Sequence, residues 1–127
     1  MSRKDDLRRR TGVTGEALAR RALEREGYRV LSCNYRCRYG EVDLVAEERG
    51  IIAFVEVKTR RGGAFGLPAL AVTRAKRGRM IRVALHYLAT NRLTGVTARF
   101  DVVSVIASSE GWKVEILRNA FSVEEGG

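Results

Sequence analysis

The sequence is short of the residue types that build zinc sites and membrane spans. It contains two cysteines and one histidine. Cys33 and Cys37 have no histidine near them, and two thiols cannot complete a structural zinc site. We therefore expect both cysteines to be ordinary packing residues. His86 is expected to be a surface or half-buried helix residue. No run approaches the ~20 apolar residues of a membrane span, and the N-terminus lacks the apolar core of a signal peptide. We therefore expect a cytoplasmic protein without a membrane partner.

Acidic residues are also in deficit. Lys and Arg total 24 against 15 Asp and Glu, which gives a formal net charge of +9. Such an excess suits a polyanionic partner, because phosphate contacts release counterions and supply most non-specific affinity. No segment combines a basic face with the bulky aromatics of a membrane binder. DNA is the expected partner, with RNA as the alternative.

The chain has neither internal repeats nor a linker, and its 127 residues suit one domain, 1–127. Residues 1–11 are rich in arginine and poor in apolar residues, which predicts a mobile basic arm. Residues 119–127 become acidic and glycine-rich, which predicts a loose tail.

Hydrophobic periodicity predicts an α/β order of elements. Helices are expected over residues 14–26, ended by Gly27, and over 73–89, with Thr73 as N-cap. Helical spacing predicts a buried stripe on the second helix, made of Met80, Ile81, Val83, Ala84, Tyr87 and Leu88. Strands are expected over 28–36, 99–106 and 112–118, in addition to a hairpin between residues 39 and 61. Residues 59–68 hold glycines, arginines and the only proline, and are expected to form a loop that contacts nucleic acid. Asp101, inside an apolar strand, is expected to be structural and paired with an arginine or a backbone amide.

The hairpin is the stretch that carries chemistry. Two apolar runs, 39–46 and 51–61, flank a charged turn that ends in Gly50. Side chains alternate faces along a strand, so a turn with an even number of residues would bring Asp43, Glu56 and Lys58 together. A turn of odd length would separate them.

These three side chains suit phosphoryl chemistry. Mg²⁺ prefers oxygen ligands, and one or two carboxylates plus substrate phosphate oxygens make a sufficient site, which Asp43 and Glu56 could supply. Lys58 could orient water and offset negative charge. The alternative is a solvated polar strand with Asp43 paired to an arginine. Glu56 and Lys58 lie where a buried strand emerges, and carboxylates grouped at such a place favour a functional site over a solvated strand.

The segment 40–46, Gly-Glu-Val-Asp-Leu-Val-Ala, followed by 54–60, Phe-Val-Glu-Val-Lys-Thr-Arg, resembles the core signature of the YraN-type uncharacterised protein family (family 0102). That family is similar to the archaeal Holliday junction resolvases and to the restriction-endonuclease-like superfamily, whose motif is Asp followed by Glu-x-Lys. Val42 stands where the wider superfamily often has proline. The resemblance implies a three-layer α/β fold in which helices flank a central mixed sheet.

For function, the resemblance implies a Mg²⁺-dependent endonuclease, with Mn²⁺ as a substitute, that acts on DNA and on branched DNA in particular. It implies that Glu16, a helical glutamate, joins Asp43 and Glu56 at the metal, and that Lys76 lies beside the catalytic strands. A homodimer is one expected state, because cutters of branched DNA commonly act as two-fold dimers.

Basic residues around these positions are expected to contact the nucleic acid. They are Arg36, Arg38, Arg60, Arg61, Arg74, Lys76 and Arg77. The segment 35–39 interleaves tyrosines with arginines, which suits base stacking or an edge strand whose arginines cover apolar surface. Two other function classes stay open: a non-catalytic nucleic-acid-binding protein with the same fold, and an accessory factor whose basic face meets an acidic protein.

Overall fold

The computed structural model describes residues 3–61 and 73–121, with side chains from residue 14 onward. Within these ranges the elements follow one another as α1 (Arg3–Arg25), β1 (Arg29–Cys37), β2 (Gly40–Glu48), β3 (Ile51–Arg61), α2 (Arg74–Thr90), β4 (Ala98–Ser108) and β5 (Gly111–Phe121). The strands form one sheet in the order β1-β2-β3-β4-β5. Among the described strands only β3 and β4 pair in parallel, so the sheet is mixed.

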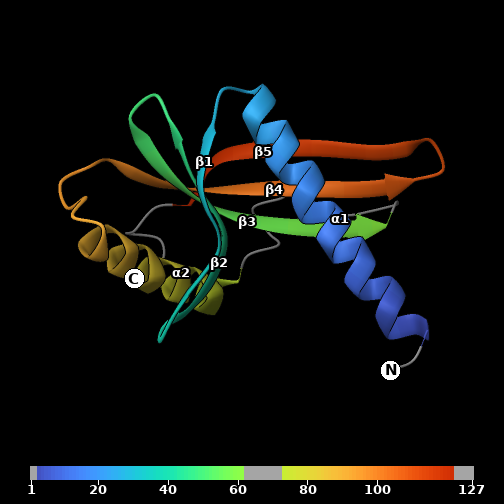
Figure 1. The fold of residues 1–127 in the computed structure, drawn as a ribbon, viewed down its shortest axis with the longest axis horizontal. Coiled ribbons are helices and arrows are strands. Elements are labelled where there is room, and N and C mark those ends of the chain that lie inside the picture. Colours follow the sequence, from blue (N-terminus) through green and yellow to red (C-terminus); the bar gives the residue numbers. More distant parts are fainter. Residues whose placement is uncertain (1–2, 62–72, 122–127) are drawn as a thin grey trace.

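The two helices cover opposite faces of the sheet, as Figure 1 shows. On one face Met80 of α2 packs in a buried cluster with Phe54. On the other, Leu23 of α1 packs in a second cluster with Val55. Neighbouring residues of β3 therefore enter different cores, which explains its continuous apolar run. The protein has the three-layer α/β fold that we expected.

Helix α2 forms the crossover that a parallel strand pair requires. Its N-cap is Thr73, whose hydroxyl oxygen accepts a hydrogen bond from the Lys76 N–H at 3.2 Å. The predicted buried stripe is confirmed residue for residue: Met80, Ile81, Val83, Ala84, Tyr87 and Leu88. Among the described residues, neither helix is both long and apolar enough to cross a membrane.

Helix α1 begins at Arg3, earlier than the predicted start at residue 14. It includes residues 3–11, which we expected to be a mobile arm. Arginine, lysine and leucine, which make up most of this segment, are good helix formers. Basic composition alone therefore gave no reason to end the helix.

Strand β5 extends further than predicted, and strand β3 includes residues that were also expected to begin a loop. Strand β5 continues to Phe121, which pairs with Phe100 of β4 and is buried. Residues 119–121 therefore belong to the sheet, and the rest of the expected tail lies outside the described residues. Strand β3 continues to Arg61, so the start of the expected 59–68 loop is strand, and residues 62–68 lie outside the described ranges.

Gly15 sets the distance between α1 and β3. A Cβ atom at this position would lie 2.1 Å from Oγ1 of Thr59. We therefore expect Gly15→Ala to lower the free energy of unfolding by about 1–3 kcal/mol, although alanine is the better helix former. Urea denaturation would measure the change. Adding Thr59→Ala to the variant should restore most of the loss, and a single variant as stable as the wild type would contradict the close packing.

Candidate metal and nucleic-acid site

The β2–β3 turn has the even length that the candidate site needs. It consists of Arg49 and Gly50, both with positive φ, 52° and 81°. This conformation belongs to the two-residue turns that match the twist of a hairpin. Glu48 then pairs with Ile51, and Leu44 with Val55. Odd positions of β2 therefore lie opposite even positions of β3, as the alternation predicts.

Asp43 lies where β2 departs from β3. The paired residues end at Leu44 and Val55. Beyond them, the Val57 N–H donates a hydrogen bond of 2.8 Å to Oδ2 of Asp43. Val42 and Leu44, two positions apart, pack in the clusters on opposite faces, so β2 rotates at Asp43. This side chain is thus held by backbone at a break in the sheet.

Glu56 is a buried acid that contacts two lysines. The residue is 5% exposed. Its Oε1 accepts a hydrogen bond from Nζ of Lys76 on α2, and Nζ of Lys58 lies 3.8 Å from the same oxygen. Lys76 therefore points to the sheet, as expected. The structure brings Asp43, Glu56 and Lys58 together, and α2 adds a second ammonium group.

The electrostatics of this group are those of a crowded anionic site. Burial, and then the charge of Glu56, raise the pKa of Asp43 to about 7, against the hydrogen bond from Val57. Burial and the charge of Lys76 lower the pKa of Lys58. A cation bound between the two carboxylates would offset the negative charge that raises the pKa of Asp43. The arrangement therefore favours binding of positive charge.

Glu16 lies at the border of this group. Its Oε2 accepts a hydrogen bond of 3.5 Å from Asn34, and its charge contributes to the raised pKa of Asp43. The sequence-based interpretation missed Asn34, whose φ of 54° is a conformation that asparagine tolerates well. In the described part of the chain, no three His, Cys, Asp or Glu side chains are grouped around one metal position. Ligation by Glu16 stays a prediction.

The donor set fits Mg²⁺. Magnesium is commonly bound by one or two carboxylates plus substrate phosphates, and it keeps several water ligands. Asp43 and Glu56 meet that requirement, and the raised pKa of Asp43 reports the unfavourable negative charge that a cation would neutralise. In the structure the charge of Glu56 is compensated by Lys76. When a metal ion binds, Glu56 would contact both this lysine and the ion.

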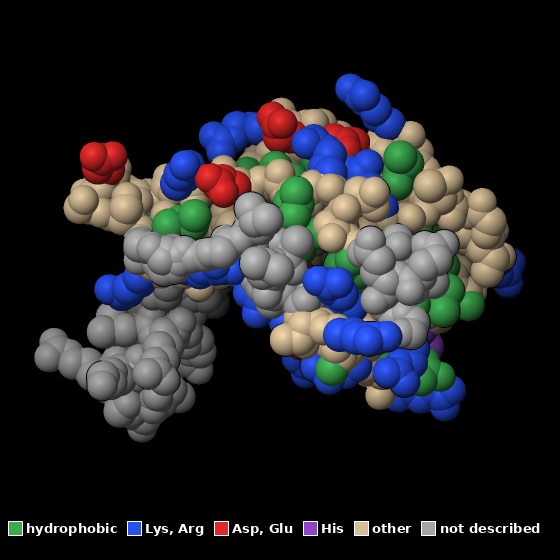
Figure 2. Space-filling model, turned by 180° about the vertical axis from the view of Figure 1, so that it is seen from behind, with side chains coloured by type: hydrophobic (Ala, Val, Ile, Leu, Met, Phe, Trp, Pro, Cys, Tyr) green, Lys and Arg blue, Asp and Glu red, His purple; other side chains and the backbone are tan. Residues whose placement is uncertain are grey.

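Positive charge is concentrated on α2 beside these acids. The helix has no acidic residue. Its five lysine and arginine residues all lie in its first nine positions. Arg74, Arg79 and Arg82 are exposed, and Lys76 and Arg77 are half-buried. Figure 2 shows Lys and Arg side chains gathered over α2, at the lower right. The positive end of the helix dipole adds to these side-chain charges, so this surface attracts anions.

The other arginines predicted to contact nucleic acid lie on β1, in the turn after it and at the end of β3. Arg36 forms a 3.1 Å ion pair with Glu41. Arg38 lies over the ring of Tyr39, 4.8 Å from its centroid. Both belong to the edge of the sheet at β1 and the turn that follows it. Arg60 and Arg61 end β3, on the strand that carries Glu56.

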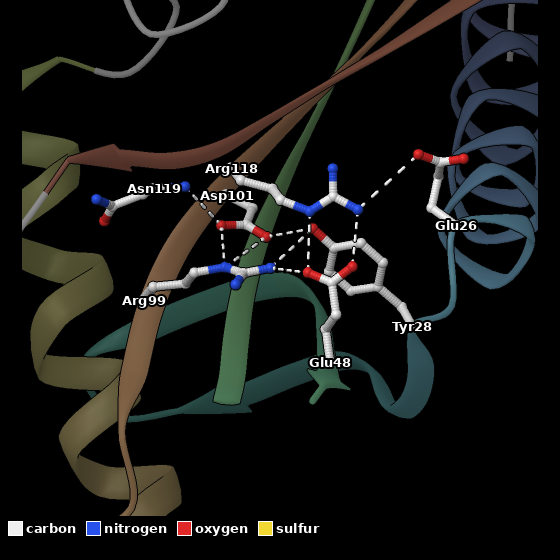
Figure 3. A network of polar contacts seen from close by, with 7 residues as sticks. All are labelled: Glu26, Tyr28, Glu48, Arg99, Asp101, Arg118 and Asn119. Carbon is white, nitrogen blue, oxygen red and sulfur yellow. Dashed lines mark hydrogen bonds and ion pairs between the residues drawn. The ribbon is translucent and has the colours of Figure 1, made fainter. Parts of the chain in front are cut away.

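A second polar group, at the other end of β2, contrasts with the first (Figure 3). Asp101 is fully buried and accepts hydrogen bonds from Arg99, from the Tyr28 hydroxyl at 2.7 Å and from the Asn119 backbone N–H at 2.9 Å. Asp101 was expected to pair with an arginine or a backbone amide, and it pairs with both.

Glu48 completes this second group. It accepts hydrogen bonds from Arg118 at 2.7 Å and from Arg99. The hydrogen bonds from Arg118 are the main cause that lowers its pKa to about 2. In this second group each acid is paired with at least one arginine, as in a structural network. Asp43 differs, because its surroundings raise its pKa and so disfavour its negative charge.

Comparison with known proteins places these residues in a family. The model of the uncharacterised protein family UPF0102 matches residues 15–105, a range that contains both candidate acids and both lysines. The chain belongs to this family. It is 48% identical over 117 residues to a UPF0102 protein of Syntrophus aciditrophicus, with 92% of each chain covered.

Two further UPF0102 proteins are similar over most of their length. The protein of Geobacter metallireducens is 46% identical, with 88% of this chain and 92% of the relative covered. That of Alkaliphilus metalliredigens is 46% identical, with 87% and 96% covered. The expected family is thus confirmed. The family description names no reaction.

Proposed function

We propose that this UPF0102 chain binds nucleic acid and hydrolyses phosphodiester bonds in DNA with Mg²⁺, for which Mn²⁺ can substitute. The observation that carries the proposal is the meeting of Asp43 and Glu56 at a break in the sheet, where burial and mutual repulsion raise the pKa of Asp43 to about 7. Within this proposal the three-layer fold is of the restriction-endonuclease-like type.

Each side chain has a role that follows from its position. Asp43 and Glu56 would hold the metal, which when bound polarises a phosphoryl oxygen and lowers the pKa of water. Lys58, 3.8 Å from Glu56, would orient the attacking water and offset charge on the phosphate. Lys76 would keep Glu56 in place, and Glu16 would support water at the border.

The basic surface supplies affinity. Arg74, Arg79 and Arg82 on α2 would bind the phosphate backbone, and Arg60 and Arg61 would extend this contact along β3. Phosphate contacts of this kind make affinity fall steeply with salt and carry little sequence information. The substrate would therefore be selected by its structure, with branched DNA as one candidate.

A cleavage panel tests the proposal. Single-stranded, duplex, flap and four-way junction DNA would be incubated with wild type, Lys58→Ala and Lys113→Ala in Mg²⁺ and in Mn²⁺. Lys113 is the control, because it is an exposed lysine of β5. We expect cleavage by wild type and Lys113→Ala, and about 100-fold slower cleavage by Lys58→Ala. Absence of cleavage on every substrate, or equal rates for all three proteins, would contradict the proposal.

The second candidate is a nucleic-acid-binding protein without catalysis. It is favoured by the Lys76 contact, which already compensates Glu56 without a metal. This function predicts salt-sensitive DNA binding that survives loss of Asp43 and Glu56, and no divalent-ion binding in calorimetry. An accessory role would instead be recognised by competition between DNA and an acidic protein.

A further inference from the structure

A pocket that the proposed reaction does not use lies between α2 and the start of the β2 strand. It has a volume of about 310 Å³ and is lined by Tyr39, Arg82, Leu85 and His86. Leu85 is 58% exposed, which makes it the most exposed large apolar side chain among the described residues. The pocket thus combines an aromatic ring, an imidazole, an apolar wall and a cation.

Neighbouring contacts hold the rings of this pocket in place. The Tyr35 hydroxyl and Nδ1 of His86 are 2.6 Å apart and share a hydrogen bond. The rings of His86 and Tyr39 meet nearly edge to face, with centroids 6.2 Å apart. The Arg38 guanidinium lies over Tyr39. A ligand would therefore meet rings that are ordered before it binds, which reduces the entropy lost on binding.

The pocket and the two acids are connected by basic residues. Arg79, Arg82 and His86 have the i, i+3, i+7 spacing that places side chains on one flank of a helix. Lys76, which contacts Glu56, is ten residues before His86, or about 15 Å along the helix. At a rise of about 3.4 Å per nucleotide, that distance corresponds to about four nucleotides of a stacked strand.

We infer that this pocket binds an unpaired nucleobase of the DNA strand whose phosphates follow Arg82 and Arg79 to Asp43 and Glu56. Aromatic side chains stack on the face of any base, and arginines beside them hold the backbone. The faces of paired bases are covered by their neighbours in the duplex, so the pocket selects DNA with a single-stranded segment. This inference rests on the proposed function and adds a substrate class to it.

The test measures binding in EDTA, so it does not depend on cleavage. Fluorescence anisotropy would compare a single-stranded oligonucleotide with a fully paired duplex, for wild type, Tyr39→Ala and Tyr39→Phe. Trp112→Ala is the control, because Trp112 is an exposed aromatic on β5. We expect Tyr39→Ala to weaken single-strand binding about 10-fold and to leave duplex binding unchanged. Tyr39→Phe and Trp112→Ala should bind both as the wild type does.

Other outcomes would overturn the inference. They are an equal loss for both DNA forms, no loss for either, or an equal loss in the Trp112→Ala control. A second variant, Leu85→Lys, tests whether the pocket receives another copy of the chain. If this variant turns a dimer into a monomer in light scattering and binds single strands normally, the pocket is a protein interface and the inference is wrong. If the protein cleaves DNA but Tyr39→Ala binds single strands as the wild type does, only this inference is refuted. If Tyr39→Ala weakens single-strand binding but the wild type cleaves no DNA, only the proposed reaction is refuted.

Discussion

Asp43→Asn is expected to slow metal-dependent DNA cleavage by about 10³-fold or more, a loss of about 4 kcal/mol in transition-state stabilisation. Asparagine keeps an oxygen that can accept the Val57 N–H hydrogen bond, which is 2.8 Å in the structure. It lacks the negative charge that would hold the cation beside Glu56. Single-turnover cleavage of the best substrate measures the rate.

The same substitution is expected to stabilise the protein above neutral pH. The carboxyl has an ordinary pKa of 3.8 and a folded-state pKa of about 7. Between these values the unfolded chain releases a proton that the folded chain retains, so the free energy of unfolding falls as pH rises from about 4 to about 7. Asparagine does not titrate, so the variant escapes this loss of a few kcal/mol, at about 1.4 kcal/mol per pKa unit.

Urea denaturation in EDTA, near pH 4 and near pH 8, checks this expectation. The difference between Asp43→Asn and wild type should be small at the lower pH and in favour of the variant at the higher one. Glu47→Gln is the matched control, because this acid of β2 forms an exposed pair with Arg29. A variant that is less stable at both pH values, or that cleaves DNA at the wild-type rate, would contradict the role of Asp43.

Arg99→Met is expected to lower the free energy of unfolding by about 3–5 kcal/mol. Arg99 donates hydrogen bonds to Asp101, which is fully buried, and to Glu48, which is nearly so. Removing one partner of a buried ion pair leaves an uncompensated charge, which is strongly destabilising. Equilibrium unfolding in urea measures the loss.

Two matched variants show whether burial causes this effect. Arg118→Met removes a second partner of Glu48, but the Arg118 side chain is 38% exposed against 15% for Arg99, so its loss should be smaller. Arg29→Met breaks an exposed pair, and its effect should stay within about 1 kcal/mol. A loss for Arg99→Met no larger than that of Arg29→Met would show that the network is not a source of stability.

The sequence by itself determined the type and order of the elements, and it made the convergence of Asp43, Glu56 and Lys58 depend on the length of one turn. Alternation along two strands and a glycine at the turn are local properties, and they restrict the hairpin to a short turn whose parity decides which side chains meet. The same locality explains why the stripe of α2 was predicted correctly. Helix and strand periods depend on neighbours within a few residues.

Tertiary structure alone decided the contacts that join distant segments. The contact of Lys76 with Glu56, the bond of Asn34 to Glu16 and the pocket between Tyr39 and His86 each need two elements to pack at one distance and rotation. No pattern within a single element contains that information. The raised pKa of Asp43 has the same origin, because burial and like charge arise when the sheet and its helices enclose both acids.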